Sequence, residues 1–344
     1  MLIVDDSALV REVLSRGLGA DPELEVVGTA PDVYVARDKI VLLKPDVLTL
    51  DIEMPRMSGV DFLKRLMPQY PVPVIVCSAL AAPGARATLE ALQYGAVDFV
   101  LKPSSAAGAK LNEMLEELRE KVKMAAAVDV SRWRRQETGK VEADLEPPPG
   151  ESTDKLIAIG ASAGGTVALH TMIKGFPHDM PGTVVVQHMP PVFTKIFAES
   201  LASASRVEVM EARDRERIQA GRVLIAPGDR HLEVERFGSS YRARVCDGEK
   251  VNGHRPSVDV LFASIARCVG AKAVGVILTG MGRDGAQGML QMRRAGARTL
   301  AQDEASCVVF GMPRAAMDCG AAERLVALSD MNSAIIGALG SKRR

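Results

Sequence analysis

The sequence has neither the cysteine spacing of a disulfide-bonded or zinc-binding protein nor an excess of charge of either sign. Its 344 residues include 5 cysteines, which lie far apart and form no Cys-x-x-Cys pair. This spacing fits reduced thiols in a cytosolic protein. The 43 basic residues balance the 43 acidic ones, which gives a formal net charge of +0. We therefore expect neither nucleic acid nor an anionic membrane surface as the main partner.

Long apolar runs are also absent. No run reaches the roughly 18 residues that a membrane-spanning helix needs. Met1 leads directly into the strand-like Leu2–Val4, without the pattern of a signal peptide. We expect a cytoplasmic protein that does not insert into a membrane. Hydrophobic residues nevertheless make up 47% of the chain, which is enough for a sizeable core in each of two domains.

Apolar strands and helical patterns alternate five times between Met1 and Lys123. The expected strands are Leu2–Val4, Glu25–Thr29, Val47–Leu50, Val74–Val76 and Ala96–Val100. The expected helices are Leu9–Leu18, Val33–Leu43, Gly59–Met67, Ala85–Gln93 and Lys110–Lys123. This alternation predicts an α/β domain with a doubly wound parallel sheet and helices on both faces.

Polar residues follow the ends of four of these strands. Asp5, Asp6 and Asp51 should converge at the switch point of the sheet, where ligands bind. Three crowded carboxylates repel one another unless a cation joins them, and oxygen ligands of this kind suit Mg²⁺. A carboxylate beside Mg²⁺ could accept a phosphoryl group, whose oxygens Ser78 and Lys102 could reach. The alternative for a single residue is a helix cap, which Asp6 could be, but the joint placement favours a site.

These residues lie in motifs that resemble the receiver domain of response regulators, which has a flavodoxin-like fold. The motifs are VDDSALVR at 4–11, LDIEMPRMSGVDFL at 50–63, CSAL at 77–80 and GAVDFVLKP at 95–103. The resemblance implies that Asp51 is the phosphoacceptor and that Lys102 pairs with the phosphoryl group. It implies Ser78 and Phe99 as the switch pair. The Mg²⁺ ligands that it implies are Asp5, Asp6, Asp51 and the backbone carbonyl of Glu53.

The periodicity is lost over residues 124–153. This stretch ends in the acidic, proline-rich VEADLEPPPGEST at 141–153. Pro147–Pro149 cannot be helical and favours extended polyproline geometry. We predict a semi-rigid linker at 124–153 that separates a domain at 1–123 from a second domain at 154–344.

The second domain opens on a strand, a tight turn and a helix. Leu156–Ile159 is an apolar strand, Gly160–Gly165 reads GASAGG, and Thr166–Ile173 has a helical pattern. Small neighbours let the backbone turn sharply and leave the oxygen of Ser162 uncovered. The alternative is that Ser162 only caps the helix.

The rest of the chain predicts a Rossmann-like α/β domain with a mainly parallel sheet and a β-hairpin. The expected strands are Thr183–Val186, Val207–Met210, Arg222–Ala226, Ala273–Leu278 and Arg298–Ala301, with a hairpin of His231–Glu235 and Tyr241–Val245. The expected helices are Val192–Ala202, Val258–Val269, Ala286–Ala295 and one near Pro313–Met317.

Three strand ends of this domain carry Ser162, His188 and Asp284, in that order along the chain. A serine hydroxyl is a weak nucleophile until an imidazole takes its proton, and the imidazole needs a carboxylate to orient it. Alone, His188 could be a structural histidine and Asp284 could cap the following helix. Their joint placement with Ser162 favours a catalytic triad.

A competing signal lies in the same domain. Gly280-x-Gly282-x-x-Gly285 stands between a strand and a helix, with Asp303 near the end of the next strand, as in dinucleotide-binding proteins. An NAD(P)-dependent oxidoreductase is therefore one alternative, and a phospho-switched scaffold without catalysis is another. The match lies late in its domain, however, and the same glycines suit an oxyanion pocket.

The second domain contains long motifs that resemble the catalytic domain of chemotaxis-type protein-glutamate methylesterases, the CheB family. They are IGASAGG at 159–165, VVVQHMPPVFTKIFAESL at 184–201, IAPGDRHLEV at 225–234, VNGHRPSVDVLF at 251–262, VGVILTGMGRDGAQGM at 274–289 and AQDEASCVVFGMPRAA at 301–316. The resemblance implies Ser162 as nucleophile, His188 as general base and acid, and Asp284 as orienting acid. It gives the Met281 N–H a part in the oxyanion hole. The family commonly has threonine where this chain has Ala163.

The resemblance also implies an activity and its partners. A phosphorylation-activated methylesterase would hydrolyse glutamate γ-methyl esters on chemoreceptors and would deamidate receptor glutamines. Its phosphodonor would be a chemotaxis histidine kinase, and it would need Mg²⁺ only for phosphorylation, with no cofactor for ester hydrolysis. We expect the unphosphorylated receiver domain to cover the active site and phosphorylation at Asp51 to loosen that packing.

Overall fold

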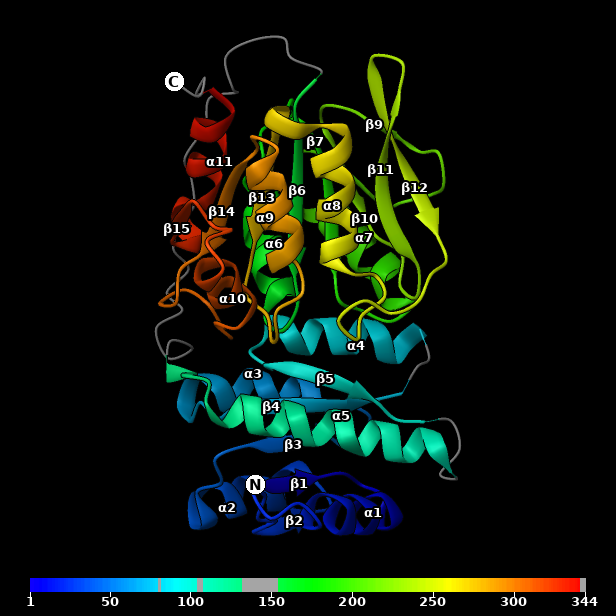
Figure 1. The fold of residues 1–344 in the computed structure, drawn as a ribbon. Helices are drawn as coiled ribbons and strands as arrows, with labels where there is room; N and C mark the ends of the chain where they lie inside the picture. The colour runs from blue at the N-terminus through cyan, green and yellow to red at the C-terminus, as the bar shows by residue number, and fades with distance from the viewer. Residues whose placement is uncertain (80–81, 104–107, 132–153, 341–344) are drawn as a thin grey trace. The chain divides into compact units, whose positions relative to one another are not determined.

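The computed structural model describes residues 1–79, 82–103, 108–131 and 154–340. Contacts within the chain divide it into two compact units, Met1–Gly139 and Lys140–Arg344. Figure 1 colours the first unit from blue to blue-green and the second from green to red. In the ranges described, none of the helices combines the length and the apolar character needed to cross a membrane. The proline-bearing part of the expected linker lies outside the described residues.

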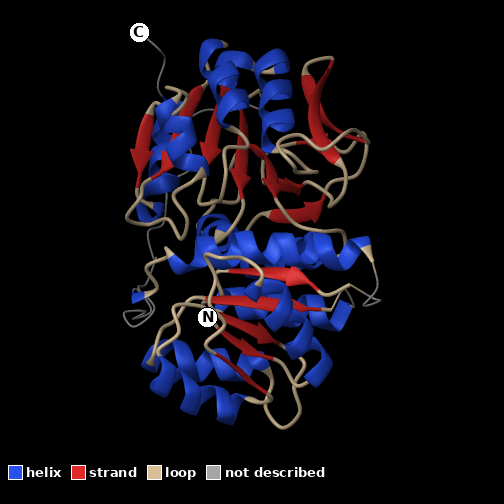
Figure 2. Ribbon diagram, turned by 60° about the horizontal axis from the view of Figure 1, so that its bottom comes forward, coloured by secondary structure: helices blue, strands red, loops and turns tan. Residues whose placement is uncertain are grey.

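The first unit contains a five-stranded parallel sheet with the order β2-β1-β3-β4-β5. The strands are β1 (Leu2–Val4), β2 (Gly28–Ala30), β3 (Leu48–Asp51), β4 (Val74–Ser78) and β5 (Asp98–Leu101). Helices cover both faces of this sheet (Figure 2). They are α1 (Ala8–Gly19), α2 (Val33–Leu43), α3 (Gly59–Gln69), α4 (Ala82–Gln93) and α5 (Ala109–Ala126). The predicted doubly wound fold is confirmed, although β2 begins three residues later than expected.

The strand order reverses at β1, and this reversal positions the acidic residues. Val4 at the end of β1 pairs with Leu50 near the end of β3. Asp5 and Asp51 come next on their respective strands, so they lie side by side at the carboxyl edge of the sheet.

The second unit contains a seven-stranded parallel sheet with the order β15-β14-β13-β6-β7-β10-β8. The strands are β6 (Leu156–Ala161), β7 (Gly182–Gln187), β8 (Glu208–Glu211), β10 (Arg222–Ile225), β13 (Ala273–Ile277), β14 (Arg298–Gln302) and β15 (Arg324–Val326). The helices are α6 (Gly165–Lys174), α7 (Phe193–Ala204), α8 (Val258–Cys268), α9 (Ala286–Arg294), α10 (Met312–Asp318) and α11 (Met331–Gly340). In Figure 1, α8 and α9 lie on the near face of this sheet.

The predicted hairpin is present, and it is longer than expected. It consists of β11 (His231–Phe237) and β12 (Ser240–Cys246), and the short β9 (Arg217–Ile218) joins it to form a three-stranded antiparallel sheet. Its apolar face belongs to the same buried cluster as α8. A hydrogen bond of 2.8 Å from the Val234 N–H to the Ser264 hydroxyl ties the hairpin to that helix. The hairpin therefore helps to hold α8 in place, which matters for the site below.

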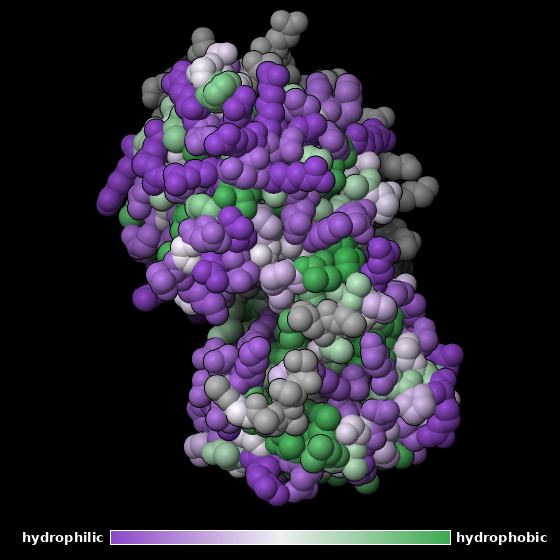
Figure 3. Space-filling view, turned by 90° about the vertical axis from the view of Figure 1, so that its right-hand side faces the viewer, coloured by the Kyte–Doolittle hydropathy of each residue, from purple (hydrophilic) through white to green (hydrophobic). Residues whose placement is uncertain are grey.

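Hydrophilic side chains cover most of the surface shown in Figure 3. Phe237, at the end of β11, is 53% exposed. The guanidinium of Arg242 lies 3.3 Å from the centre of its ring. A cation over an aromatic face is a favourable contact, so this exposed ring is partly covered by its own hairpin.

Gly160 in β6 provides a test of the packing between the central sheet and α8. A Cβ at Gly160 would lie 2.2 Å from Cγ1 of Val258. Gly160→Ala should therefore lower the free energy of unfolding by about 1–3 kcal/mol. Val258→Ala removes the two methyl groups with which the new Cβ would overlap. The double variant should therefore lose about 1 kcal/mol less free energy of unfolding than the sum of the two single losses. Calorimetric unfolding of the four chains measures this, and strict additivity would contradict the contact.

Candidate functional site

Ser162 lies one residue beyond the end of β6, on the turn that leads into α6. Its N–H donates to the carbonyl of Thr279 at 3.0 Å, which ties the turn to the segment after β13. The N-cap of α6 is Gly164, and no side chain makes a capping hydrogen bond there. The alternative in which Ser162 only caps this helix is therefore wrong.

Gly164 makes the sharp turn possible. Its φ is 72°, in the left-handed region that favours glycine. A Cβ at this position would lie 2.5 Å from Cβ of Val308. Both the backbone conformation and the space available therefore require glycine.

His188 lies next to Ser162 because β6 and β7 pair in register. Ala161 pairs with Gln187, so Ser162 and His188 are the next residues on the two strands. The His188 N–H donates to the Ala161 carbonyl at 3.2 Å. On its other edge β6 pairs with β13, and Asp284 lies on the loop after β13. The three predicted residues thus come from three adjacent strands.

The side chains of His188 and Asp284 form a buried pair. Nε2 of His188 lies 2.8 Å from Oδ2 of Asp284, and the two side chains are 8% and 0% exposed. The other ring nitrogen, Nδ1, is buried and has no hydrogen-bond partner in the described part of the chain. Nδ1 is therefore the atom left to accept a proton, although the structure contains no hydrogen bond between it and Ser162.

Asp284 is surrounded by hydrogen-bond donors. Its Oδ1 accepts from the Ser257 hydroxyl at 2.8 Å and from Nδ2 of Asn252 at 3.0 Å. The N–H groups of Val258 and Asp259, at the start of α8, donate to it at 2.7 and 3.2 Å. The carboxylate therefore accepts from the first turn of α8.

The expected alternative for Asp284, a cap on the following helix, is wrong. That helix is α9, whose N-cap is Gly285 without a side-chain capping bond. Burial alone would raise the pKa of Asp284, but hydrogen bonds from His188, Asn252 and Ser257 outweigh burial and hold the pKa far below its usual value. Asp284 is therefore ionised at neutral pH and can stabilise a protonated His188.

The patterns that predicted the triad did not single out Asn252, His254 or Ser257. The ring of His254 stacks on that of His188, with 3.7 Å between the centres and 10° between the planes. All three residues lie in the motif VNGHRPSVDVLF at 251–262. The motif indicated that this segment belongs to the site. A loop has no periodicity, however, so the contacts of its individual residues could not be derived.

The glycines of the Gly280–Gly285 loop are explained by close packing. A Cβ at Gly280 would lie 2.8 Å from Cβ of Ser162, and a Cβ at Gly285 would lie 2.5 Å from Cγ1 of Val258. Asp303, the acidic residue of the dinucleotide alternative, accepts from the N–H of Ser306 at 3.1 Å. The Met281 N–H of this loop donates to no other described residue. It is thus available to a ligand.

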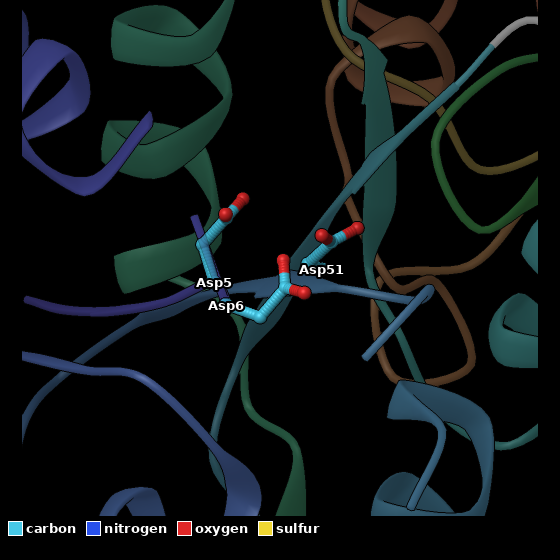
Figure 4. A group of neighbouring side chains, drawn as sticks. All are labelled: Asp5, Asp6 and Asp51. Carbon is cyan, nitrogen blue, oxygen red and sulfur yellow. The ribbon is translucent and has the colours of Figure 1, made fainter. Parts of the chain in front are cut away.

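In the first unit the three predicted carboxylates lie together. Ligand oxygens of Asp5, Asp6 and Asp51 lie within 4.8 Å of one another (Figure 4). Three carboxylates fit a hard divalent cation such as Mg²⁺. The capping alternative for Asp6 is wrong, because the N-cap of α1 is Ser7, whose hydroxyl accepts from Val10 N–H at 3.4 Å. The carbonyl of Glu53 stays a prediction as a ligand.

Lys102 joins this group from the end of β5. Its Nζ lies 2.7 Å from Asp5 and 2.8 Å from Asp51. Burial raises the pKa of Asp51, and the positive charge of Lys102 offsets only part of that increase. Burial alone would lower the pKa of Lys102, but Asp51 and Asp5 raise it above its ordinary value. The ammonium is therefore held in its charged form beside the predicted phosphoacceptor.

Ser78 and Phe99 occupy the neighbouring strands β4 and β5, and their role as a switch pair stays a prediction. The Thr88 hydroxyl of α4 donates to Ser78 Oγ at 2.6 Å, and Ser78 donates to the Ala79 carbonyl at 3.2 Å. Phe99 is 6% exposed. Both residues are thus packed inside the first unit, and the hydroxyl of Ser78 is engaged by α4.

Comparison with known proteins agrees with both units. The CheB methylesterase family model matches residues 157–335, and the response regulator receiver domain model matches residues 1–116. The chain is 55% identical to a protein-glutamate methylesterase/protein-glutamine glutaminase of Syntrophotalea carbinolica, over 100% of this chain and 98% of that protein. It is 48% identical to the protein of that name from Escherichia coli, over 99% of this chain and 97% of that protein.

A solved structure agrees as well. The CheB methylesterase catalytic domain of Thermotoga maritima is 37% identical and superposes with a TM-score of 0.53, covering 54% of this chain and 99% of that chain. Family models, relatives that align along the whole chain and a shared fold lead to one assignment. The chain belongs to the CheB methylesterase family and carries a response-regulator receiver domain ahead of its methylesterase domain.

Proposed function

We propose that this protein hydrolyses glutamate γ-methyl esters on chemoreceptors to glutamate and methanol, and deamidates receptor glutamines, during chemotactic adaptation. The observation that carries the proposal is the buried 2.8 Å pair of His188 and Asp284 at the strand end next to Ser162. The names of the relatives support the substrate class. The protein would act in the cytoplasm, with a chemotaxis histidine kinase as phosphodonor.

The chemistry begins at Ser162. His188 takes the hydroxyl proton of Ser162 at Nδ1 while the serine oxygen attacks the ester carbonyl. Asp284 holds the imidazole through Nε2 and stabilises its positive charge. His188 then returns the proton to the leaving methoxide, and methanol departs from an acyl-enzyme. Water, deprotonated by the same imidazole, attacks the acyl carbon and releases glutamate and free Ser162.

Negative charge develops on the carbonyl oxygen during each attack. N–H groups that are aimed at this oxygen stabilise it strongly because the site does not have to reorganise. The Met281 N–H, which has no partner among the described residues, is the first candidate donor. Ala163 has no hydroxyl, so the nearby donors must be backbone groups. Deamidation follows the same route, with ammonia as the leaving group.

The receiver site would control this chemistry. Asp5, Asp6, Asp51 and the Glu53 carbonyl would hold Mg²⁺, which when bound neutralises charge on the phosphoryl group. The Asp51 carboxylate would accept the phosphoryl group, and Lys102 would pair with its oxygens. Phosphorylation would then release the active site from the receiver domain, which is a shift between two populations.

Ser162→Ala should abolish methanol release from methylated receptor, because no other nucleophile replaces the hydroxyl. Ser203→Ala is the matched control, since Ser203 is an exposed serine of α7 that bonds only within its own helix. A serine-reactive phosphonate should label the wild-type chain at Ser162, as located by mass spectrometry. Release at the wild-type rate from the alanine variant would overturn the assignment of the nucleophile.

Asp284→Asn should lower kcat by about 10⁴-fold, because the neutral amide cannot stabilise the protonated imidazole. Steady-state methanol release measures the loss. A decrease of less than about tenfold would show that the carboxylate does not orient the base.

The same variant reports the charge of Asp284. A carboxyl whose pKa is lowered on folding adds stability above its unfolded pKa of about 3.9 and loses that contribution as the pH falls through the folded value. The difference in stability between wild type and Asp284→Asn should therefore shrink as the pH falls below about 4. A difference that grows in acid would contradict the lowered pKa.

Asp51→Asn should remove activation by a small-molecule phosphodonor. With Mg²⁺ and acetyl phosphate the wild-type chain should hydrolyse methyl esters about 5- to 150-fold faster, which is the usual range of coupling between sites. The variant should keep the basal rate.

A fragment of residues 151–344 should hydrolyse methyl esters faster than the unphosphorylated whole chain does. An equally slow fragment would argue against inhibition of the active site by the receiver domain.

A further inference from the structure

Gln187, the last residue of β7, contacts the backbone of both Ser162 and His188. It is 3% exposed, and its Nε2 donates to the Ser162 carbonyl at 3.0 Å and to the His188 carbonyl at 3.4 Å. Because both neighbours are acceptors, only the NH₂ end of the amide can face them. One buried side chain thus links the carbonyls of the residues proposed as nucleophile and base.

The bond to Ser162 fixes the direction of the next N–H. The Ser162 carbonyl also accepts from the Gly165 N–H at 2.7 Å, so both of its lone pairs are used. In a trans peptide the C=O and the N–H point in opposite directions. Holding the Ser162 oxygen therefore holds the Ala163 N–H on the opposite side of the peptide.

The Ala163 N–H is unusual. Ala163 is 3% exposed, yet its N–H donates to no residue in the ranges described. Buried N–H groups without a partner are rare in proteins. In a strand–turn–helix elbow, the N–H after the nucleophile is a typical oxyanion donor. The unpaired group is thus placed where a developing negative charge would satisfy it.

The elbow also leaves room for the amide. A Cβ at Gly165 would lie 2.2 Å from Oε1 of Gln187, so a side chain there would displace the amide. Oε1 itself is buried and has no hydrogen-bond partner within the described residues. A buried unpaired oxygen lowers stability. The amide of Gln187 thus donates to two carbonyls while its own oxygen stays without a partner.

We propose that Gln187 is a positioning residue for the hydrolytic reaction. Its amide fixes the Ser162–Ala163 peptide so that the Ala163 N–H, together with that of Met281, faces the oxyanion. It also holds His188 beside the nucleophile through the His188 carbonyl. The proposal rests on the triad proposed above, and it adds a donor to the oxyanion hole and the side chain that orients this donor.

Gln187→Met keeps the size of the side chain and removes the donor. We expect kcat for methanol release to fall about 10²-fold, as for a misplaced catalytic group or a lost oxyanion donor. KM should change less than about twofold, because the lost interaction matters only in the transition state. Labelling of Ser162 by the phosphonate should slow in parallel.

Asn332→Leu is the matched control. Asn332 of α11 also donates through a side-chain amide to a carbonyl, that of Met172, at 2.9 Å, and it too has a buried oxygen without a partner in the described chain. Among the described residues it makes no hydrogen bond with the triad. Its loss should lower the melting temperature about as much as Gln187→Met does and should leave kcat unchanged. Equal changes of kcat in the two variants would make Gln187 merely structural and would overturn the proposal.

Gln187→Glu decides the question if the methionine variant does not fold. An ionised carboxylate cannot donate to the two carbonyls, whereas a protonated one can donate to one of them. The kcat of this variant divided by that of the wild type should therefore be low at pH 8 and should rise towards pH 6. A ratio that is independent of pH, or wild-type activity at pH 8, would overturn the role of Gln187.

Failure of this proposal can be distinguished from failure of the proposed function. If Ser162→Ala is inactive and Gln187→Met has the kcat of the wild type, the triad stands and the role of Gln187 is wrong. If Ser162→Ala retains full activity, the proposed nucleophile is wrong, and no effect of Gln187 can be assigned to an oxyanion hole next to it.

Discussion

The buried charge of Asp284 is the constraint on which the methylesterase unit depends. Removing a carboxylate from water is costly unless donors surround it, and here they come from His188, Ser257, Asn252 and the first turn of α8. The loop before α8, the helix itself and the loop after β13 are therefore assembled around one side chain. The hairpin contributes by packing against α8. Positioning of the imidazole and local folding thus depend on the same contacts.

Both units place their chemistry in the same way. Parallel strands end at one edge of the sheet, and the residue after the last paired position lies beside its counterpart on the next strand. In the first unit this register brings Asp5 beside Asp51, and in the second it brings Ser162 beside His188. The sites differ because the first collects acids and an ammonium, whereas the second places a serine beside an imidazole that is paired with a single acid.

Strand ends were predictable from the sequence, and loop contacts were not. Alternation and apolar runs predicted both parallel sheets, the hairpin and the strand-end residues, because period and burial are local properties. The two-residue β9 is too short to carry a pattern, and β15, at the edge of its sheet, has two exposed residues among its three and so no apolar run. The interpretation of Ser162, Asp6 and Asp284 as helix caps was wrong. Whether a side chain caps a helix depends on the direction in which it points, and the sequence pattern does not give that direction. The partners of Asp284 in the 251–257 loop lie about thirty residues away along the chain, and periodicity cannot pair residues of two loops.

The bridge that Lys102 makes between Asp5 and Asp51 sets the charge that an incoming ion meets. With all three carboxylates ionised, the three acids and one ammonium leave two negative charges at this edge of the sheet. A divalent cation cancels that charge, whereas a monovalent cation leaves half of it in place. A second ammonium could not fill the same role, because it has no vacant coordination positions for phosphoryl oxygens. The lysine thus leaves a net charge at this edge of the sheet that matches a divalent cation.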